Sequence, residues 1–289
     1  MKINSEQMLN ELGQPILHKT HCYKQPGVSL YAEDCLETLK KIETGSIDFM
    51  LQDPPYGVLS AMEWDKAPLL PEMWAEWERV LKPNGAWVFT ATQPFASSLI
   101  TSRAGFFKYE IIWRKNKIGN FLNAKIQPLR NHENILVFYR MQPTYNPIKR
   151  KLLNSITKSA SQSARNTKAF SINPENAATK ELIYNKKAGE DGFPFSVIDI
   201  DFESDAFDSS SKHQDRHPTQ KPLELMRYLI KTYSNENDLV FDGYSGSGTT
   251  AAACIKEKRN FIGSEMNKEY FDLSVKRLSQ IIKQPELPW

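Results

Sequence analysis

The stretch of sequence that decides the fold is Phe241-Asp-Gly-Tyr-Ser-Gly-Ser-Gly-Thr-Thr250, near the end of a chain of 289 residues. It follows the apolar run Leu239–Phe241, which is typical of a buried strand, and it leads into a helix predicted over residues 249–258. The loop contains three glycines, Gly243, Gly246 and Gly248. Glycines here let the backbone turn tightly and approach a ligand closely, although an isolated loop of this kind also occurs as a plain tight turn.

The chemistry of this loop points away from a phosphate ligand. Its glycines have the spacing G-x-x-G-x-G rather than the G-x-G-x-x-G of dinucleotide-binding proteins, and Thr249-Thr250 stands where a Walker loop would carry its lysine. Glu265 ends the next predicted strand, where a carboxylate suits a ribose diol because it can accept two hydrogen bonds. These features predict a ligand with a nucleoside but no pyrophosphate, a description that S-adenosylmethionine meets.

A second motif, Asp53-Pro-Pro-Tyr56, follows the apolar run Ile47–Leu51. A buried strand there would deliver the motif to the carboxyl edge of the sheet, where open α/β folds bind ligands. Because prolines donate no hydrogen bond, the Pro54 carbonyl and the Asp53 carboxylate remain as two acceptors for an exocyclic amino group. Tyr56 offers a flat face for a planar base. The alternative is a Pro-Pro turn with an ordinary Asp and a core Tyr.

Outside these motifs, strand-like and helix-like segments alternate along the chain. The predicted strands cover residues 28–31, 47–51, 86–90, 109–113, 135–139, 239–241 and 260–263. The predicted helices cover residues 35–42, 71–81, 223–233, 249–258 and 268–282. This alternation favours an α/β fold with a mostly parallel sheet that is covered on both faces.

The net charge of +3 conceals a strongly basic segment. Residues 111–187 contain 15 Lys or Arg and three acidic residues, a net charge of +12, which leaves −9 for the rest of the chain. The zone 141–215, rich in Asn, Ser, Thr and Lys, is predicted to be a loop-dominated insertion. A basic segment on an acidic protein is typical of a polyanion-binding protein, although it also occurs as a solvated lysine-rich face. The acidic stretch 190–208 receives no functional interpretation.

Composition excludes several classes of protein. The three cysteines, Cys22, Cys35 and Cys254, form no C-x-x-C, which argues against a disulfide scaffold and a zinc site. No apolar run approaches the roughly 18 residues of a membrane helix. The polar N-terminus lacks a hydrophobic signal core, so we expect a cytoplasmic protein.

Three motifs together carry a family resemblance. Asp53–Tyr56, His217-Pro-Thr-Gln-Lys-Pro222 and Phe241–Thr250, in this order along the chain, resemble the beta group of DNA amino-methyltransferases. The resemblance implies the Rossmann-like fold of S-adenosylmethionine-dependent methyltransferases, with a mostly parallel twisted sheet, a circularly permuted motif order and an inserted target-recognition region. The domains implied are an N-terminal extension (1–27), a catalytic half (28–140), a basic target-recognition insertion (141–215) and a cofactor-binding half (216–289).

The resemblance also assigns site residues. The catalytic residues are Asp53, Pro54, Pro55 and Tyr56. The residues expected at S-adenosylmethionine are Asp34, Cys35, Asp53, His217, Thr219, Gln220, Lys221, Phe241, Asp242, Gly243, Tyr244, Gly246, Ser247, Gly248, Thr249, Thr250, Glu265 and Met266. Within this set, Asp34 is expected at the adenine amino group, Glu265 at the ribose hydroxyls, and 219–221 over the carboxylate end. We expect DNA contacts from Arg114, Lys115, Lys117, Lys149, Arg150, Lys151 and Arg165.

The function implied is methyl transfer from S-adenosylmethionine to adenine N6 in duplex DNA, with the target base flipped out of the stack and with no metal. Cytosine N4 is the alternative acceptor, and an RNA or protein-glutamine methyltransferase, a nicotinamide-dependent oxidoreductase or a non-catalytic DNA-binding regulator fit the motifs less well. The expected partner is double-stranded DNA, with or without a cognate restriction endonuclease. A homodimer is a further expectation, for which Trp64, Trp74 and Trp77 are candidate surface residues unless they lie in the core.

Overall fold

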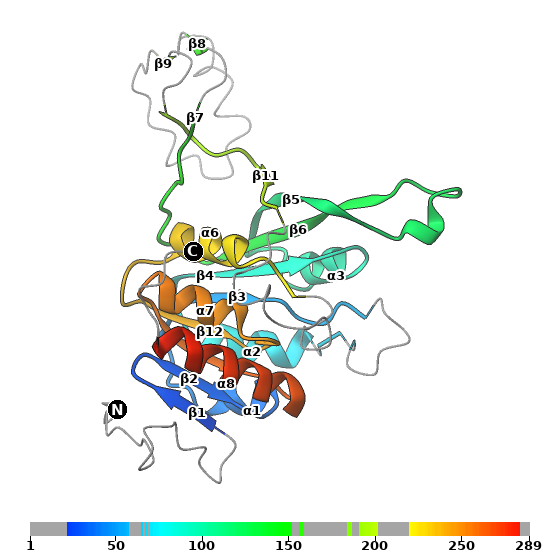
Figure 1. The fold of residues 1–289 in the computed structure, drawn as a ribbon. Coiled ribbons are helices and arrows are strands. Elements are labelled where there is room, and N and C mark those ends of the chain that lie inside the picture. Colours follow the sequence, from blue (N-terminus) through cyan, green and yellow to red (C-terminus); the bar gives the residue numbers. More distant parts are fainter. Residues whose placement is uncertain are drawn as a thin grey trace. The chain divides into compact units, whose positions relative to one another are not determined.

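The computed structural model describes residues 22–57, 65, 67–68, 70–151, 156–158, 184–186, 191–201 and 220–283. The main sheet is built from β1 (Cys22–Gln25), β2 (Val28–Tyr31), β3 (Ile47–Gln52), β4 (Leu81–Ala91), β5 (Phe107–Gly119), β6 (Arg130–Tyr139), β11 (Val197–Asp199), β12 (Leu239–Asp242) and β13 (Asn260–Ser264). These strands lie in the order β1-β2-β13-β12-β3-β4-β6-β5-β11 (Figure 1). The expected α/β fold with a mostly parallel sheet is confirmed, since β2, β13, β12, β3 and β4 are parallel neighbours.

The centre of the sheet brings the two sequence motifs together. Strands β12 and β3 are parallel neighbours, with Val240 opposite Phe49 and Phe241 opposite Met50. The chain continues from β12 to β13 on one side and from β3 to β4 on the other side. Open α/β sheets bind ligands at such a reversal of strand order, beyond the carboxyl ends of the strands. The Asp53 motif and the glycine-rich loop both lie at the carboxyl ends of β3 and β12.

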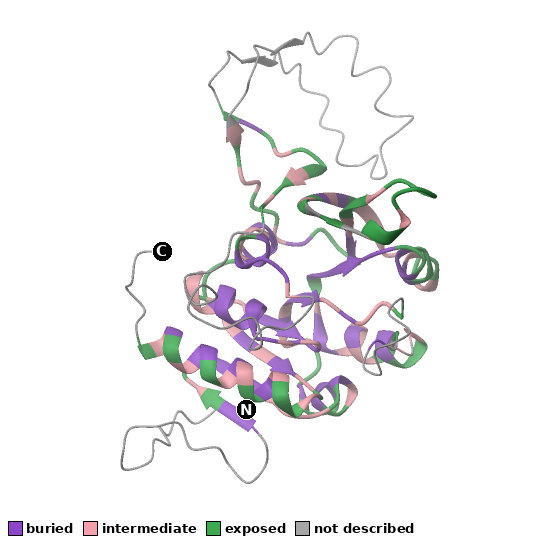
Figure 2. Ribbon diagram, turned by 45° about the vertical axis from the view of Figure 1, so that its right-hand side comes forward, coloured by how far each residue is buried: buried purple, intermediate pink, exposed green. Residues whose placement is uncertain are grey.

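Helices cover both faces of the sheet. α1 (Cys35–Lys41), α2 (Leu70–Val80) and α3 (Phe95–Ser102) share one hydrophobic cluster with Trp87 and Phe89 of β4. α6 (Leu223–Tyr233), α7 (Thr249–Lys256) and α8 (Lys268–Lys283) share the other cluster with Ala86 and Val88. Because successive side chains of a strand point to opposite faces, the two clusters are the two layers of core on either side of the sheet (Figure 2).

The tryptophans expected as a dimer surface belong to the core. Trp74 and Trp77 on α2 are 1% and 0% exposed, and their rings meet edge to face with centroids 5.2 Å apart. The buried positions of α2 fall on one helical face, which places both indoles against the sheet. Of the two alternatives, surface and core, the core is therefore confirmed for these two residues, and Trp64 lies outside the described residues.

The end of the sheet differs from the expected pattern. The predicted strands at 109–113 and 135–139 are present, but β6 is antiparallel to both β4 and β5. A hairpin joins β5 to β6, and strands joined this way pair antiparallel. β5 also continues to Gly119, so Arg114–Lys117 lie within a strand rather than in the loop after it.

β1 and α3 are among the elements that have no counterpart in the sequence predictions. β1 pairs antiparallel with β2, so residues 22–25, expected in the N-terminal extension, belong to the sheet. α3 follows β4 directly and packs Phe95, Ala96 and Leu99 into the core. Both elements are short, and short elements carry little periodic signal.

Residues Pro147–Phe195 form a separate compact unit, distinct from the unit of residues 1–146 and 196–289. Within it, β7 (Arg150–Lys151) pairs with β10 (Asp191–Gly192), and β8 (Ile156–Lys158) pairs with β9 (Tyr184–Lys186). This unit is shorter than the expected insertion 141–215, and β11 returns to the main sheet beside β5.

Candidate active site

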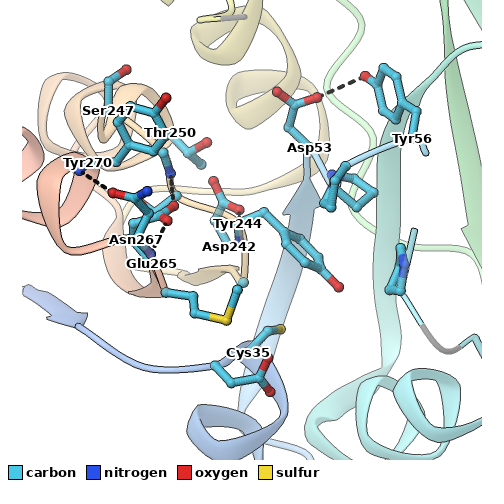
Figure 3. A pocket seen from close by; sticks show the side chains of 18 of the residues that line it. Cys35, Asp53, Tyr56, Asp242, Tyr244, Ser247, Thr250, Glu265, Asn267 and Tyr270 are labelled. Carbon is cyan, nitrogen blue, oxygen red and sulfur yellow. Dashed lines mark hydrogen bonds between the residues drawn. The ribbon is translucent and has the colours of Figure 1, made fainter. Parts of the chain in front are cut away.

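A cavity of about 480 Å³ lies at the carboxyl ends of β12 and β3. Its wall includes both the Asp53 motif and the glycine-rich loop, which face one another in Figure 3. The predicted site residues in the wall are Asp34, Cys35, Asp53, Pro54, Pro55, Tyr56, Gln220, Lys221, Asp242, Gly243, Tyr244, Gly246, Ser247, Thr249, Thr250, Glu265 and Met266.

Four predicted cofactor residues are not among those wall residues. The ring of Phe241 is fully buried in the core, and Gly248 is the N-cap of α7, with a left-handed φ of 76°. His217 and Thr219 lie outside the described residues. The contribution of Phe241 is instead its backbone carbonyl, which accepts a hydrogen bond from Gln52.

Gln52 joins the two motifs directly. Its fully buried amide donates from Nε2 to the carbonyl of Phe241 at 2.8 Å and accepts at Oε1 from the backbone N–H of Gly243 at 3.1 Å. These bonds cross between residues about 190 positions apart in the chain. Since Asp53 is the next residue, the amide sets the position of the glycine-rich loop relative to the carboxylate. No feature of the sequence singled out this glutamine.

Asp53 is the centre of a polar cluster. Its Oδ1 accepts hydrogen bonds from the hydroxyl of Tyr56 at 2.9 Å and from the hydroxyl of Thr90 on β4. Lys221 donates to both carboxylate oxygens, at 2.7 Å and 2.8 Å. Three groups therefore donate to Oδ1, and Lys221 also donates to Oδ2. These bonds hold the carboxylate in one orientation.

Lys221 lies at the start of a chain of alternating charges. The lysine is 6% exposed, and its ammonium is also 3.6 Å from Oε2 of Glu133, whose Oε1 accepts from Lys115 at 2.7 Å. Burial alone would lower the pKa of Lys221, but Asp53 and Glu133 outweigh it and raise that pKa well above its ordinary value. Burial would likewise raise the pKa of Glu133, but the two lysines outweigh it and lower that pKa. Lys221 and Glu133 are therefore both charged at neutral pH.

Tyr56 is held on three sides. Its ring stacks on Phe95 with centroids 5.8 Å apart at 22°, and the ammonium of Lys221 is 5.5 Å from the ring centroid. The backbone N–H groups of Tyr56 and Gly57 donate to Oδ1 of Asp65 at 2.8 Å and 3.0 Å. Burial, followed by the nearby Asp53 charge, raises the pKa of Tyr56 well above its ordinary value, so the hydroxyl keeps its proton.

The other end of the cavity is acidic. Glu265, at the end of β13, accepts from the backbone N–H of Gly246 at 2.8 Å and from that of Asn267 at 2.7 Å. Asp34 is the N-cap of α1 and accepts from the N–H of Leu36 at 2.8 Å. Burial raises the pKa of the Asp242 carboxyl to about 7, so this group changes its charge near neutral pH.

A side chain has no space at Gly243, in the glycine-rich loop. A Cβ built there would lie 2.0 Å from Sγ of Cys35 and 3.1 Å from Oε1 of Gln52. Burial raises the pKa of the Cys35 thiol well above its ordinary value, so Cys35 is a packing residue rather than a nucleophile. Because Gly243 has no side chain, the glycine-rich loop can pack directly against Cys35 of α1 in the wall of the cavity.

Replacing Gly243 with alanine is expected to lower the free energy of unfolding by about 1–3 kcal/mol, because the added methyl overpacks a fully buried contact. Urea denaturation measures this change. Gly105→Ala is the matched control, since a Cβ there meets nothing within 4 Å. Cys35→Ala in the Gly243→Ala background should recover part of the loss, because it removes the sulfur. Equal stability of Gly243→Ala and Gly105→Ala would contradict this account.

The residues expected at DNA are divided between the two units of the chain. Arg114 makes an exposed two-pronged ion pair with Asp199, while Lys115 is mostly buried against Glu133. In the separate unit, Lys149 and Arg150 lie over the rings of Phe193 and Phe195, at 3.3 Å and 3.4 Å from the centroids. The side chains of Lys117, Lys151 and Arg165 lie outside the description.

Several residues of this site escaped the sequence analysis. Thr90, Glu133 and Gln52 contribute side chains from three strands. Asp65 accepts from backbone N–H groups just after Asp53, and Asn267 accepts from backbone N–H groups in the first turn of α8. Only the register of β3, β4 and β6 brings the first three together, and register is a tertiary property. Within the described residues, no cluster of three or more His, Cys, Asp or Glu could hold a metal ion, and no helix is long and apolar enough to cross a membrane.

Comparison with known proteins agrees with this geometry. DNA adenine methyltransferase YhdJ of Escherichia coli (strain K12) is 29% identical over 260 residues, 85% of this chain and 80% of that protein. The type II methyltransferase M1.MboII of Moraxella bovis is 27% identical over 87% of this chain and 96% of its own length. The crystal structure of an M1.HpyAVI–SAM complex superposes with a TM-score of 0.55 at 26% identity, covering 86% of this chain and 99% of that one.

One solved structure shows the fold alone. The PvuII cytosine-N4-specific DNA methyltransferase superposes with a TM-score of 0.56 at 18% identity, over 89% of this chain and 92% of that one. The DNA methylase family of N6 and N4 methyltransferases matches residues 47–276. The match begins at β3, directly before Asp53, and ends within α8. With its motifs on one cavity and this match over most of its length, the chain belongs to the N6/N4 DNA methylase family.

Proposed function

We propose that this protein transfers the methyl group of S-adenosylmethionine to adenine N6 in duplex DNA, with Asp53, Pro54 and Tyr56 holding the flipped base. The observation that carries the proposal is the shared cavity, in which Gln52 fixes the glycine-rich loop beside the Asp53 motif. A duplex hides the amino nitrogen of adenine within the stack, so the base must leave the helix, at roughly a few kcal/mol.

The acidic end of the cavity suits the methyl donor. S-adenosylmethionine supplies an electrophilic methyl group on a sulfonium sulfur, and it carries a ribose diol. Glu265 is oriented by two backbone N–H groups and keeps lone pairs for a diol, while Asp34 and Asp242 add negative charge to the same wall. A wall of carboxylates favours a cation and disfavours phosphates, which supports this donor over a dinucleotide.

The two oxygens of Asp53 have different roles in this proposal. Oδ1 is contacted by Tyr56, Thr90 and Lys221, so it anchors the carboxylate. Oδ2 accepts from Lys221 and has further lone-pair capacity, because an ionised carboxylate offers about four acceptor sites. We assign Oδ2 and the carbonyl of Pro54 as the two acceptors for the target amino group. Accepting both N–H bonds directs the nitrogen lone pair out of the ring plane.

Lys221 has the role of a positioning residue rather than of a cofactor contact. Its cation, 2.7 Å from Asp53, donates to both carboxylate oxygens and holds the carboxylate in one orientation. A strong base is not needed, because the amino proton becomes acidic only once the nitrogen is methylated and then leaves to Asp53 or to water. Alignment and electrostatic orientation therefore supply the catalysis.

Nucleoside analysis tests the proposal. Duplex DNA incubated with the protein and isotopically labelled S-adenosylmethionine is digested to nucleosides, and the label is expected in N6-methyladenosine (deoxy form). Label in N4-methyldeoxycytidine would overturn the choice of adenine and retain the enzyme class. DNA without label, alongside labelled RNA or protein, would overturn the acceptor class as well.

A further inference from the structure

The hairpin between β5 and β6 extends beyond the sheet as a two-stranded ribbon (Figure 1). β11 pairs with β5 only as far as Arg114, and β4 pairs with β6 only from Asn134 onward. From residue 115 to residue 133 the two strands therefore pair only with each other among the described strands, with Gly119 opposite Arg130. We call residues 115–133 the ribbon.

The tip of the ribbon is structured although it packs against no core. Asn120 adopts a left-handed conformation with φ of 54°, and its Oδ1 accepts from the backbone N–H of Arg130 at 2.7 Å. A 3₁₀ turn, η1 (Phe121–Asn123), follows, and the N–H of Ile126 donates to the carbonyl of Asn123 at 2.9 Å. These bonds satisfy the backbone locally, so the tip presents its side chains on a defined scaffold.

Those side chains are apolar and exposed. The exposed fractions are 58% for Ile118, 75% for Phe121, 98% for Leu122 and 81% for Ile126. Large apolar side chains gathered on an exposed tip mark an interaction surface.

The charge of the ribbon identifies the class of partner. Between Lys115 and His132 the sequence has no acidic residue, and it has three basic ones, Lys117, Lys125 and Arg130. Lys125 and Arg130 are exposed. A basic surface without carboxylates suits a polyanion better than a second copy of the same basic ribbon, because like charges would then face each other.

The root of the ribbon lies at the catalytic cluster. Lys115 and Glu133 pair across its two strands, and Glu133 is 3.6 Å from Lys221, which holds Asp53. From Lys115 to Phe121 an extended strand reaches roughly 20 Å. That length corresponds to about six base pairs along B-form DNA.

We propose that the ribbon binds duplex DNA to one side of the target base, with Phe121 and Leu122 inserted against bases in a groove. The major groove admits a two-stranded β-ribbon, and apolar side chains make contacts there with thymine methyl groups or wedge between base steps. This proposal rests on the proposed function, because it takes DNA as the substrate. It adds a contact about half a helical turn away from the methylated base.

A comparison of long and short duplexes tests the ribbon. The wild-type protein should bind a duplex with about 15 flanking base pairs on each side roughly tenfold more tightly than one with about four. The double variant Phe121→Ser, Leu122→Ser should lose that preference. Its affinity for either duplex should equal the affinity of the wild type for the short duplex. Its kcat at saturating DNA should be unchanged, because neither residue is among the wall residues of the cavity.

Controls separate this contact from its alternatives. Met141→Ser alters an apolar side chain that is 60% exposed and lies outside the ribbon, and it should bind both duplexes like the wild type. Lys125→Gln should reduce the slope of log affinity against log salt by about one. Wild-type-like binding of the long duplex by the double variant would overturn the proposal, as would a changed oligomeric state with unchanged DNA affinity. If the wild type methylated neither duplex, the proposed function itself would fail.

Discussion

Asp53→Ala is expected to reduce methyl transfer to DNA by at least about 10³-fold, because it removes one of the two acceptors that hold the target amino group. The affinity for S-adenosylmethionine should stay within about threefold of the wild type, since Gln52, Glu265 and the glycine-rich loop remain in place. Single-turnover transfer with labelled donor measures the rate, and equilibrium dialysis measures the affinity.

Two further variants make that result specific. Asp53→Asn keeps the size of the side chain but cannot balance the charge of Lys221, so it should also lose most transfer. Asp272→Ala removes an exposed carboxylate that pairs with Lys268 on α8, and it should leave transfer unchanged. Turnover retained by Asp53→Ala would show that the tetrapeptide does not hold the acceptor.

Lys221→Met is expected to impair both stability and catalysis. Asp53 and Glu133 would lose the cation they share in a largely buried cluster, which should lower the free energy of unfolding by about 3 kcal/mol. Without that cation the Asp53 carboxylate loses the group that holds both of its oxygens, so the rate of transfer should fall. Because Lys221 also lowers the pKa of Glu133, the deficit in stability relative to the wild type should shrink as the pH falls through the pKa of Glu133. Single-turnover transfer and urea denaturation at several pH values measure the two effects.

The charge chain supplies the controls for Lys221. Lys221→Met combined with Glu133→Gln removes one carboxylate together with the cation, so it should recover stability relative to Lys221→Met alone. Lys40→Met breaks an exposed pair with Glu37 and should change the free energy of unfolding by less than about 0.5 kcal/mol. An unaltered rate of transfer in Lys221→Met would refute its proposed effect on Asp53, whatever the change in stability.

Much of the fold could be predicted because its signals are local. The buried strands at 47–51 and 239–241 are short apolar runs, and the helix at 223–233 has its expected bounds. The direction of β6 could not be predicted this way, since an apolar run reads the same in a parallel and in an antiparallel neighbour. The burial of Trp74 and Trp77 likewise depends on which face of α2 meets the sheet.

For the site, the sequence alone determined the chemistry of each motif: a carboxylate beside a proline carbonyl, and a glycine-rich turn with a distant Glu265. These are properties of consecutive residues, and local covalent geometry is enough to specify them. The tertiary structure alone decided that Gln52 joins the motifs, that Lys221 and Thr90 contact Asp53, and that Glu133 pairs with Lys221. Those contacts join residues 37 to 191 positions apart, and only the tertiary fold, with the strand order and register of the sheet, brings them together.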